Sequence, residues 1–442
     1  MSQYLEDCSN KNMTQNKFFE IEDPLIESAI LVGVDRQDPT WPLKESLAEL
    51  ERLANTAGAK VVATTSQRLN TPNPKTFIGS GKAEEVASLC RTYSADLVIL
   101  DDELSPSQQT NLERIVPKDV KVIDRTALIL DIFALHATSK EGKLQVRLAQ
   151  NEYLLPRLRG MWAHLASNRM GGGVGSRFGE GESQLEVDRR MVRKRITTIK
   201  RELKHLNEVR GLQRENRYQS GIFKVALAGY TNAGKSSLLN RLAGTDVLSY
   251  DKLFATLDST TRKLVLPEGR EITITDTVGF IQKLPTTLVE AFKSTLDEIV
   301  GSDLVLHVVD ASSGEYEAQI KSVEDTLQHI GAEAITRVDV FNKTDLLCEE
   351  NLAALMQRRS DALFVSAKTG AGTDILIDRI AKVASAVDKH LLVLLPFNRG
   401  DLVSLAHERC HIISEEHIEG GTLIGMQANP HYFDLFSAFV QD

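Results

Sequence analysis

The sequence of 442 residues lacks any apolar run approaching the roughly 18 residues of a membrane-spanning helix. Its first residues show no apolar core behind a basic start, so a secretory signal is not expected. Cysteine is scarce, and the four thiols are too scattered for a zinc site or a disulfide framework: Cys8, Cys90, Cys348 and Cys410. Together these absences favour a protein of the cytoplasm, where thiols stay reduced.

Excess positive charge is also absent from the chain as a whole. The formal net charge is −9, which speaks against uniform binding to nucleic acid. Residues 189–217 depart from this average, because they contain 11 Lys and Arg against 3 Glu. A charged helix usually just faces solvent, but an excess of this size needs a counter-charge, and phosphate is the strongest candidate. The predicted RNA-binding residues are Arg189, Arg190, Arg193, Lys194 and Arg195.

One sequence motif is highly specific for nucleotide binding. Residues 229–236 read GYTNAGKS and stand between an apolar strand pattern and a helical pattern. This is the GxxxxGK[ST] phosphate loop in the context that it requires. Its glycines let backbone N–H groups point at the β-phosphate. We expect Lys235 to reach the β- and γ-phosphates and the Ser236 hydroxyl to bind Mg²⁺.

Three further loops, each after a predicted strand, complete a guanine nucleotide site. Asp276 ends a strand and can hold Mg²⁺ through a water, while the Gly279 N–H can meet the γ-phosphate. Asp345, in the NKTD loop 342–345, can accept hydrogen bonds from guanine N1 and N2, a donor pair that adenine lacks. The SAK loop 366–368 can support guanine O6 through a backbone N–H. The four motifs in this order predict binding of GTP and Mg²⁺.

The segment that senses the γ-phosphate should lie between the phosphate loop and Asp276. Residues 253–262 are rich in threonine. On spacing alone the metal ligand could be Thr256, Thr260 or Thr261.

Phe280 stands where GTPases of the Ras type carry the glutamine that orients the attacking water. Phenylalanine can neither donate nor accept a hydrogen bond. One interpretation is that this side chain swings away and that a backbone group or a bound partner places the water. The other is that it only packs the switch at rest. The first interpretation predicts slow GTP turnover without the partner.

Strand and helix patterns divide the chain into five segments and predict the fold class α/β. The segments are a polar tail (1–26), a small parallel α/β domain (27–135), a helical hairpin with a glycine-rich loop (136–218), a GTPase domain with a mostly parallel sheet (219–388) and a small α+β domain (389–442). In the hairpin, Pro156 should kink or interrupt the first helix, and residues 170–186 are too rich in glycine for regular structure. The second helix should run from about residue 183 to 216 along an apolar stripe.

Several stretches resemble one family, the HflX-type GTPases of the translation-factor-related class. The likeness rests on KLFATLDSTTR (252–262) and ITDTVGFIQKLP (274–285), and outside the GTPase segment on TFIGSGKAEEV (76–86), VIDRTALILDIFALHA (122–137) and KLQVRLAQNEYLLPRL (143–158). It extends over nearly the whole chain from residue 28. The glycine-rich loop departs from the family's usual pattern, because it has no proline and one residue more between Arg177 and Gln184.

This resemblance implies that Thr256 is the switch threonine on Mg²⁺. The resemblance also implies that the large (50S) ribosomal subunit is a partner. The N-terminal domain and the hairpin would then contact ribosomal RNA near the peptidyl-transferase centre. The implied activity is GTP hydrolysis stimulated by ribosomes, and the implied role is splitting or rescue of stalled ribosomes under stress. We expect the protein to act as a monomer.

The candidate site residues fall into three sets. The catalytic candidates are Lys235, Thr256 and Gly279, and the metal candidates are Ser236, Thr256 and, through water, Asp276. The candidates for GTP contact are Gly229, Tyr230, Thr231, Asn232, Ala233, Gly234, Lys235, Ser236, Phe254, Ala255, Thr256, Leu257, Asp258, Asp276, Thr277, Val278, Gly279, Asn342, Lys343, Thr344, Asp345, Ser366, Ala367 and Lys368.

Two other functions stay open. A GTPase acting in assembly of the large subunit would need the same GTP switch and basic surface. A regulatory switch that binds a protein effector would leave the basic helix unexplained. ATP use by the N-terminal domain is disfavoured, because GSGK at residues 79–82 lacks the spacing of a second phosphate loop.

Overall fold

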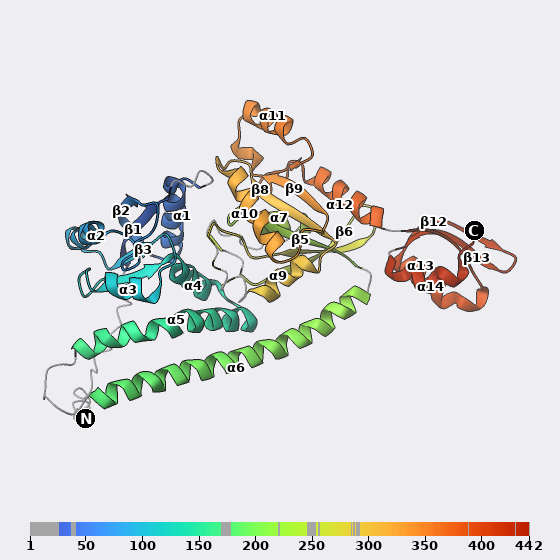
Figure 1. Cartoon of the computed structure of the whole chain (residues 1–442). Helices are drawn as coiled ribbons and strands as arrows, with labels where there is room; N and C mark the ends of the chain where they lie inside the picture. The colour runs from blue at the N-terminus through green and yellow to red at the C-terminus, as the bar shows by residue number, and fades with distance from the viewer. Residues whose placement is uncertain are drawn as a thin grey trace, which may run out of the picture.

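The computed structural model describes residues 26–36, 41–168, 178–219, 222–244, 253–254, 257–283, 285, 288, 292–387, 389–428 and 430–441. Along the chain, a four-stranded sheet is followed by two long helices, a six-stranded sheet and a three-stranded sheet (Figure 1). The predicted α/β class is confirmed. Among the described helices, none combines the length and the apolar character that crossing a bilayer demands.

The first sheet is parallel, with the strand order β2-β1-β3-β4. Its strands are β1 (Ser28–Asp35), β2 (Lys60–Arg68), β3 (Leu97–Leu100) and β4 (Lys121–Asp124), and its helices are α1 (Leu43–Thr56), α2 (Ser80–Tyr93), α3 (Pro106–Glu113) and α4 (Arg125–His136). Every side chain of β3 is buried, as expected of a parallel strand that is covered on both faces.

Two long helices, α5 (Lys140–Asn168) and α6 (Phe178–Gln219), lie antiparallel along one side of the molecule (Figure 1). Leu144 and Leu148 of α5 pack against Leu203 of α6. Ile196, Ile199 and Leu206 of the predicted stripe join the same cluster. The apolar stripe of α6 therefore faces α5, and the basic residues lie elsewhere on the helix.

One prediction about this hairpin is wrong for residues 178–186. Pro156 lies inside α5 and does not interrupt the helix, so of its two expected effects only a kink stays a prediction. In the same turn, a guanidinium nitrogen of Arg157 donates to the Tyr153 carbonyl at 3.0 Å, next to the position where proline supplies no N–H. Helix α6 begins at Phe178, so residues 178–186 are regular despite their glycines. Extending an existing helix gains one hydrogen bond per residue, which offsets the roughly 1 kcal/mol that each glycine costs.

The six-stranded sheet has the order β10-β9-β8-β5-β7-β6, in which β6 is antiparallel to β7 and the other pairs are parallel. The strands are β5 (Phe223–Gly229), β6 (Thr260–Val265), β7 (Glu271–Asp276), β8 (Leu304–Asp310), β9 (Arg337–Asn342) and β10 (Leu363–Phe364). The helices are α7 (Lys235–Ala243), α9 (Lys293–Val300), α10 (Tyr316–His329), α11 (Glu349–Arg358) and α12 (Thr373–Val387).

The last sheet is antiparallel, with the order β11-β13-β12, and lies across the GTPase sheet from the first sheet (Figure 1). It consists of β11 (Lys389–Leu395), β12 (His411–Ile418) and β13 (Gly421–Ala428), with helices α13 (Gly400–Arg409) and α14 (Pro430–Phe436). Short 3₁₀ turns span Thr344–Leu346, Phe397–Arg399 and Ser437–Phe439.

One apolar cluster joins the N-terminal sheet to the GTPase domain. It contains residues of α4 together with Phe254, Phe280 and Phe292. The ring centroid of Phe133 in α4 lies 4.6 Å from that of Phe254 and 4.7 Å from that of Phe292, both edge-on. The segments that flank the phosphate loop therefore pack directly on the N-terminal domain.

Candidate functional site

The phosphate loop joins β5 to α7, and two of its glycines are required by close packing. A Cβ atom at Gly229 would lie 2.2 Å from the Val308 carbonyl oxygen of β8. Gly234 has φ +89°, and a Cβ there would lie 2.3 Å from Nδ2 of Asn342. The loop can thus approach neighbouring strands only because these positions carry no side chain.

Lys235 begins α7 and is buried, with its ammonium group over the loop. Its Nζ donates to the carbonyl oxygens of Gly229 at 3.1 Å and Tyr230 at 2.9 Å. Burial lowers the pKa of Lys235 to about 8, although the nearby Asp276 carboxylate raises it in part. The ammonium group is therefore held by neutral carbonyls in a site where an anion would stabilise its charge.

Ser236 and Asp276 bring two hard oxygen donors together. The Ser236 hydroxyl donates to Oδ2 of Asp276 at 2.6 Å, and Asp276 is almost fully buried at the end of β7. A hydroxyl and a carboxylate beside a phosphate loop are the protein ligands that Mg²⁺ uses in nucleotide sites. The donor set therefore fits the predicted metal.

The segment after Asp276 is joined to the phosphate loop by backbone hydrogen bonds. The N–H of Phe280 donates to the Gly229 carbonyl at 3.1 Å, and the Phe280 carbonyl accepts from the Thr231 N–H at 2.7 Å. The Phe280 side chain is 1% exposed and lies in the cluster between the two domains. Gly279 lies over Lys235, since a Cβ on it would be 3.0 Å from Nζ.

The guanine-reading loops are connected to the phosphate loop and to each other. Asn342 is buried, and its Nδ2 donates to the Ala233 carbonyl while its Oδ1 accepts from the Ala367 N–H, both at 2.9 Å. The Ser366 hydroxyl donates to Oδ1 of the exposed Asp345 at 2.6 Å. Lys343 pairs with Asp310 at 2.7 Å. Ser366 thus orients the exposed carboxylate of Asp345, whose contact with guanine stays a prediction.

Three other predicted GTP contacts lie close by. The Thr344 hydroxyl donates to the Val365 carbonyl at 3.0 Å. The carbonyl of the exposed Lys368 accepts from Arg241 of α7 at 2.5 Å. The Thr277 hydroxyl is buried and donates to the Leu227 carbonyl at 2.7 Å. Each of these bonds stabilises a loop, and none of them involves a group aimed at a phosphate.

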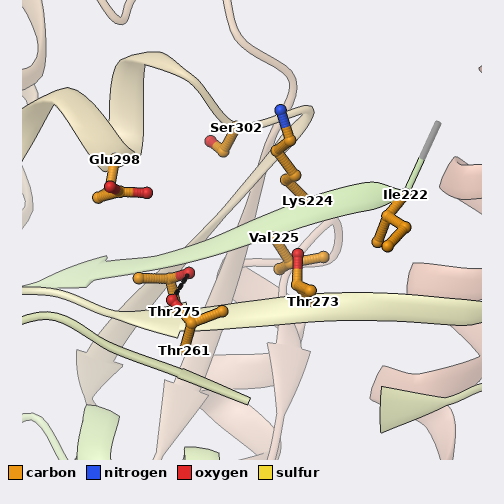
Figure 2. A pocket seen from close by; sticks show the side chains of 8 residues that line it. All are labelled: Ile222, Lys224, Val225, Thr261, Thr273, Thr275, Glu298 and Ser302. Carbon is orange, nitrogen blue, oxygen red and sulfur yellow. Dashed lines mark hydrogen bonds between the residues drawn. The ribbon is translucent and has the colours of Figure 1, made fainter. Parts of the chain in front are cut away.

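A small cavity of about 30 Å³ is lined by Thr261, one of the candidate switch threonines (Figure 2). The hydroxyls of Thr261 on β6 and Thr275 on β7 share a hydrogen bond of 2.9 Å at its wall. Thr260 also belongs to β6, opposite Asp276. Neither strand threonine can close over a nucleotide unless β6 breaks. Thr256 and Ala255 lie outside the described residues, so the role of Thr256 on Mg²⁺ stays a prediction.

Several candidate GTP contacts face the N-terminal domain instead. Phe254 and Leu257 are buried in the cluster between the domains. The Tyr230 hydroxyl donates to the carboxylate of Glu49 in α1 and accepts from the Gln282 N–H at 2.7 Å. Asp258 accepts hydrogen bonds from residues 138 and 139, just before α5.

A buried charge network behind Tyr230 was not found from the sequence. Arg125, at the start of α4, is 2% exposed and pairs with Glu49 and, at 2.8 Å, with Asp101. Lys283 reaches the same carboxylate of Asp101 at 2.5 Å. Burial alone would lower the pKa of Arg125, but Glu49 and Asp101 together raise it. The only sequence signal was an arginine placed before the apolar run of α4.

The predicted RNA-binding residues lie on α6. Arg190, Arg193, Lys194 and Arg195 are exposed, and Arg189 is partly buried. The glycine-rich loop at residues 169–177, which joins α6 to α5, lies outside the described residues.

Three known protein families match consecutive parts of this sequence. The families described as "GTP-binding GTPase N-terminal", "GTP-binding GTPase Middle Region" and "50S ribosome-binding GTPase" match residues 44–134, 136–217 and 224–343. A solved structure, that of a GTP-binding protein from the archaeon Sulfolobus solfataricus with GDP, is 24% identical and covers 82% of this chain and 99% of its own, with a TM-score of 0.43.

Relatives in sequence are closer. GTPase HflX of Caldanaerobacter subterraneus subsp. tengcongensis is 46% identical over 395 residues, which is 89% of each chain. GTPase HflX of Alkalihalophilus pseudofirmus is 50% identical over 328 residues, 74% of this chain and 76% of the relative. The chain is a GTPase and belongs to the HflX family.

Proposed function

We propose that this GTPase binds the large ribosomal subunit through its helical hairpin, in the cytoplasm, and uses GTP to split or rescue stalled ribosomes under stress. The observation that carries the proposal is the exposed basic stretch of α6 in an otherwise acidic chain. Phosphate-rich RNA supplies the counter-charge that such a helix needs. The family description "50S ribosome-binding GTPase", which matches residues 224–343, supports the same partner.

GTP hydrolysis would use the following groups of this chain. Lys235 would place its charge on the β- and γ-phosphates, and Asp345 would read guanine N1 and N2. Ser236 would hold Mg²⁺ directly and Asp276 would hold it through water, with Thr256 as a further ligand. The bound metal would neutralise charge on the β- and γ-phosphate oxygens. The Gly279 N–H would donate to the γ-phosphate.

Phe280 limits how fast the protein can hydrolyse GTP without a partner. Its side chain is buried between the domains, so this position offers no group that could orient water. A GTPase without its water-positioning group turns over slowly until a partner completes the site. We therefore propose that the ribosome supplies or orders the missing group.

Charge reversal on α6 tests the RNA contact. In a variant with Arg193→Glu, Lys194→Glu and Arg195→Glu, three phosphate contacts would become repulsive, so affinity for 50S subunits should fall by at least about tenfold. Co-sedimentation at two salt concentrations measures this loss. GTP affinity should stay within about twofold, because these residues lie far along the chain from the nucleotide loops.

A matched control carries the same type of change on another exposed helix. Arg379→Glu with Lys382→Glu alters α12 of the GTPase domain, where both residues are exposed. If both variants bind 50S subunits as the unmodified protein does, the hairpin is not the RNA-binding element.

Two outcomes would favour the alternatives. Tighter binding to precursor subunits than to mature 50S subunits would indicate a role in assembly. Absence of binding to any ribosomal particle would indicate a regulatory switch for a protein effector. Splitting itself is measured as GTP-dependent loss of 70S particles in a density gradient.

A further inference from the structure

Asp258, in the nucleotide-sensing segment, binds the start of the hairpin. Its Oδ2 accepts from the Thr138 N–H at 3.0 Å, the Thr138 hydroxyl at 2.7 Å and the Ser139 N–H at 2.7 Å. Its Oδ1 accepts from the Ser139 hydroxyl at 2.5 Å. Four donors from two residues, some 120 positions away in sequence, thus converge on one carboxylate.

This contact completes the N-terminal cap of α5. Ser139 precedes the helix, and its hydroxyl oxygen also accepts from the Gly142 N–H at 2.8 Å. The Asp258 carboxylate adds negative charge at the positive end of the helix dipole. Burial would raise the pKa of Asp258, but the hydrogen bonds from Ser139 and Thr138 outweigh it, so the pKa lies below its usual value. The carboxylate therefore stays ionised throughout the physiological range.

Gly142 shows that α5 is shaped to receive this carboxylate. A Cβ at position 142 would lie 2.3 Å from Oδ1 of Asp258. Glycine in a helix is less favourable than alanine by about 1 kcal/mol. The close approach of Asp258 gives a physical reason for glycine in the first turn.

Beyond its first turns, α5 is fixed to the N-terminal domain and to α6. The Tyr153 hydroxyl donates to Asp124 at 2.9 Å, and Arg157 donates to the Leu104 carbonyl at 2.6 Å, which ties α5 to the N-terminal domain. Lys200 of α6 pairs with Glu152 of α5 at 2.8 Å. A displacement of α5 as a rigid helix would therefore move α6 and the N-terminal domain with it.

We infer that Asp258 is a positioning residue that ties the nucleotide-sensing segment to the base of the hairpin, so that nucleotide state and hairpin position form one equilibrium. Asp258 follows the predicted switch residue Thr256 by two positions, a span of at most about 7 Å of chain. A change that recruits Thr256 to a γ-phosphate would therefore act within two residues of the Asp258 contact. By reciprocity, a partner that moves the hairpin alters the affinity for GTP. The inference deepens the proposed function and rests on it only for the identity of that partner.

The test follows the hairpin in the full chain without ribosomes. One label is attached to the exposed Cys348 of the GTPase domain and one to Thr197→Cys, an exposed position of α6, with Cys8 and Cys410 changed to Ser. Electron-spin or fluorescence distance measurement then compares Mg²⁺-GDP with Mg²⁺ and a non-hydrolysable GTP analogue. We expect the label separation to differ between the two nucleotides.

Two variants remove the contact from opposite sides. Asp258→Ala deletes the carboxylate, and Gly142→Ala displaces it while the sequence of the nucleotide-sensing segment stays unchanged. In both, the nucleotide-dependent change in separation should fall to about half or less, as coupling is lost. Affinity for the analogue should stay within about threefold for Gly142→Ala. Asp258→Asn keeps an acceptor oxygen and should restore part of the change.

Gly81→Ala is the matched control. Gly81 also lies in the first turn of a helix, α2, but a Cβ there would meet nothing within 4 Å. This variant should respond to nucleotide as the reference protein does, and thermal unfolding verifies that all variants are folded. The inference is overturned if the reference protein shows no nucleotide-dependent change, or if Asp258→Ala and Gly142→Ala both retain it. Sedimentation with 50S subunits tests the proposed function separately.

Discussion

At the scale of single residues, Lys235 is the group whose protonation the site controls most directly. Its ammonium contacts only neutral carbonyl oxygens of the loop among the hydrogen bonds of the described residues, and burial lowers its pKa to about 8. A phosphate group would supply the missing counter-charge and raise this pKa. Binding of nucleotide above pH 8 must then be accompanied by uptake of a proton.

This linkage predicts a pH dependence with a definite sign. Below about pH 8 the lysine is charged before and after binding, so affinity for GTP should be constant. Above it, the affinity should fall by up to about tenfold per pH unit, because one proton must be bound with the nucleotide. Titration calorimetry between pH 7 and 9 measures the slope. Lys235→Met should bind more weakly with no such slope, and a flat profile in the unmodified protein would contradict the linkage.

Phe280 gives a second prediction at this scale. Replacement by Gln would bury an amide in the apolar cluster and should lower the free energy of unfolding by about 1–3 kcal/mol. Turnover of GTP without ribosomes should change by less than about threefold, because the packed side chain does not point at the phosphates. Phosphate-release assays measure the turnover of GTP, and urea unfolding measures the change in stability. A rise of two orders of magnitude in turnover would mean that the missing glutamine is the only defect.

At the scale of elements, the domain interface depends on Arg125 at the start of α4. It pairs with Glu49 of α1 and with Asp101 after β3, and Glu49 in turn binds the Tyr230 hydroxyl of the phosphate loop. Lys283 reaches Asp101 from the segment after Phe280. The carboxyl edge of the first sheet, where open α/β sheets usually bind ligands, here receives segments of the GTPase domain.

Arg125→Met should therefore destabilise the interface strongly. It would leave the Glu49 carboxylate buried without its cation, which costs about 3–5 kcal/mol. Trp41 reports on this change by fluorescence in a Trp162→Phe background, since its ring stacks on Tyr230 at a centroid distance of 6.4 Å. Arg36→Met is the control, because its partner Asp102 lies 3.6 Å away and Arg36 is 45% exposed, so that pair contributes about 1 kcal/mol or less. Equal urea midpoints for the two variants would contradict the role of Arg125.

The elements also show what the sequence could and could not predict. The strand and helix patterns of residues 27–135 are local signals, and they predicted a small parallel α/β layer. The pairing of Arg125 with Glu49 joins residues 76 positions apart, and that of Tyr230 with Glu49 spans 181. Such pairs depend on how two domains pack. The periodicity of apolar residues along the sequence does not predict that packing. Helix α6 begins at Phe178, before the expected residue 183, because the long helix that follows offsets the local cost of glycine.

At the scale of the whole molecule, the phosphate loop of the GTPase domain lies against the N-terminal domain. The phosphate loop and its flanking segments pack on the N-terminal domain, and in the view of Figure 1 the hairpin runs below both domains. The nucleotide motifs were predictable because each is a short loop after a strand. The orientation of Phe280 and the contact of Asp258 with α5 were not, since both depend on the second domain.

The most direct test of this account is GTP turnover by the pure protein, measured alone, with 50S subunits and with 70S ribosomes at matched salt. We predict slow turnover alone and a rise of at least about a hundredfold with ribosomes, of the kind seen when a partner completes a GTPase site. The charge-reversed α6 variant should lose this stimulation and keep the basal rate. Fast turnover without ribosomes and no further rise on their addition would show that the water is already placed internally, and would contradict the proposal that the ribosome completes the site.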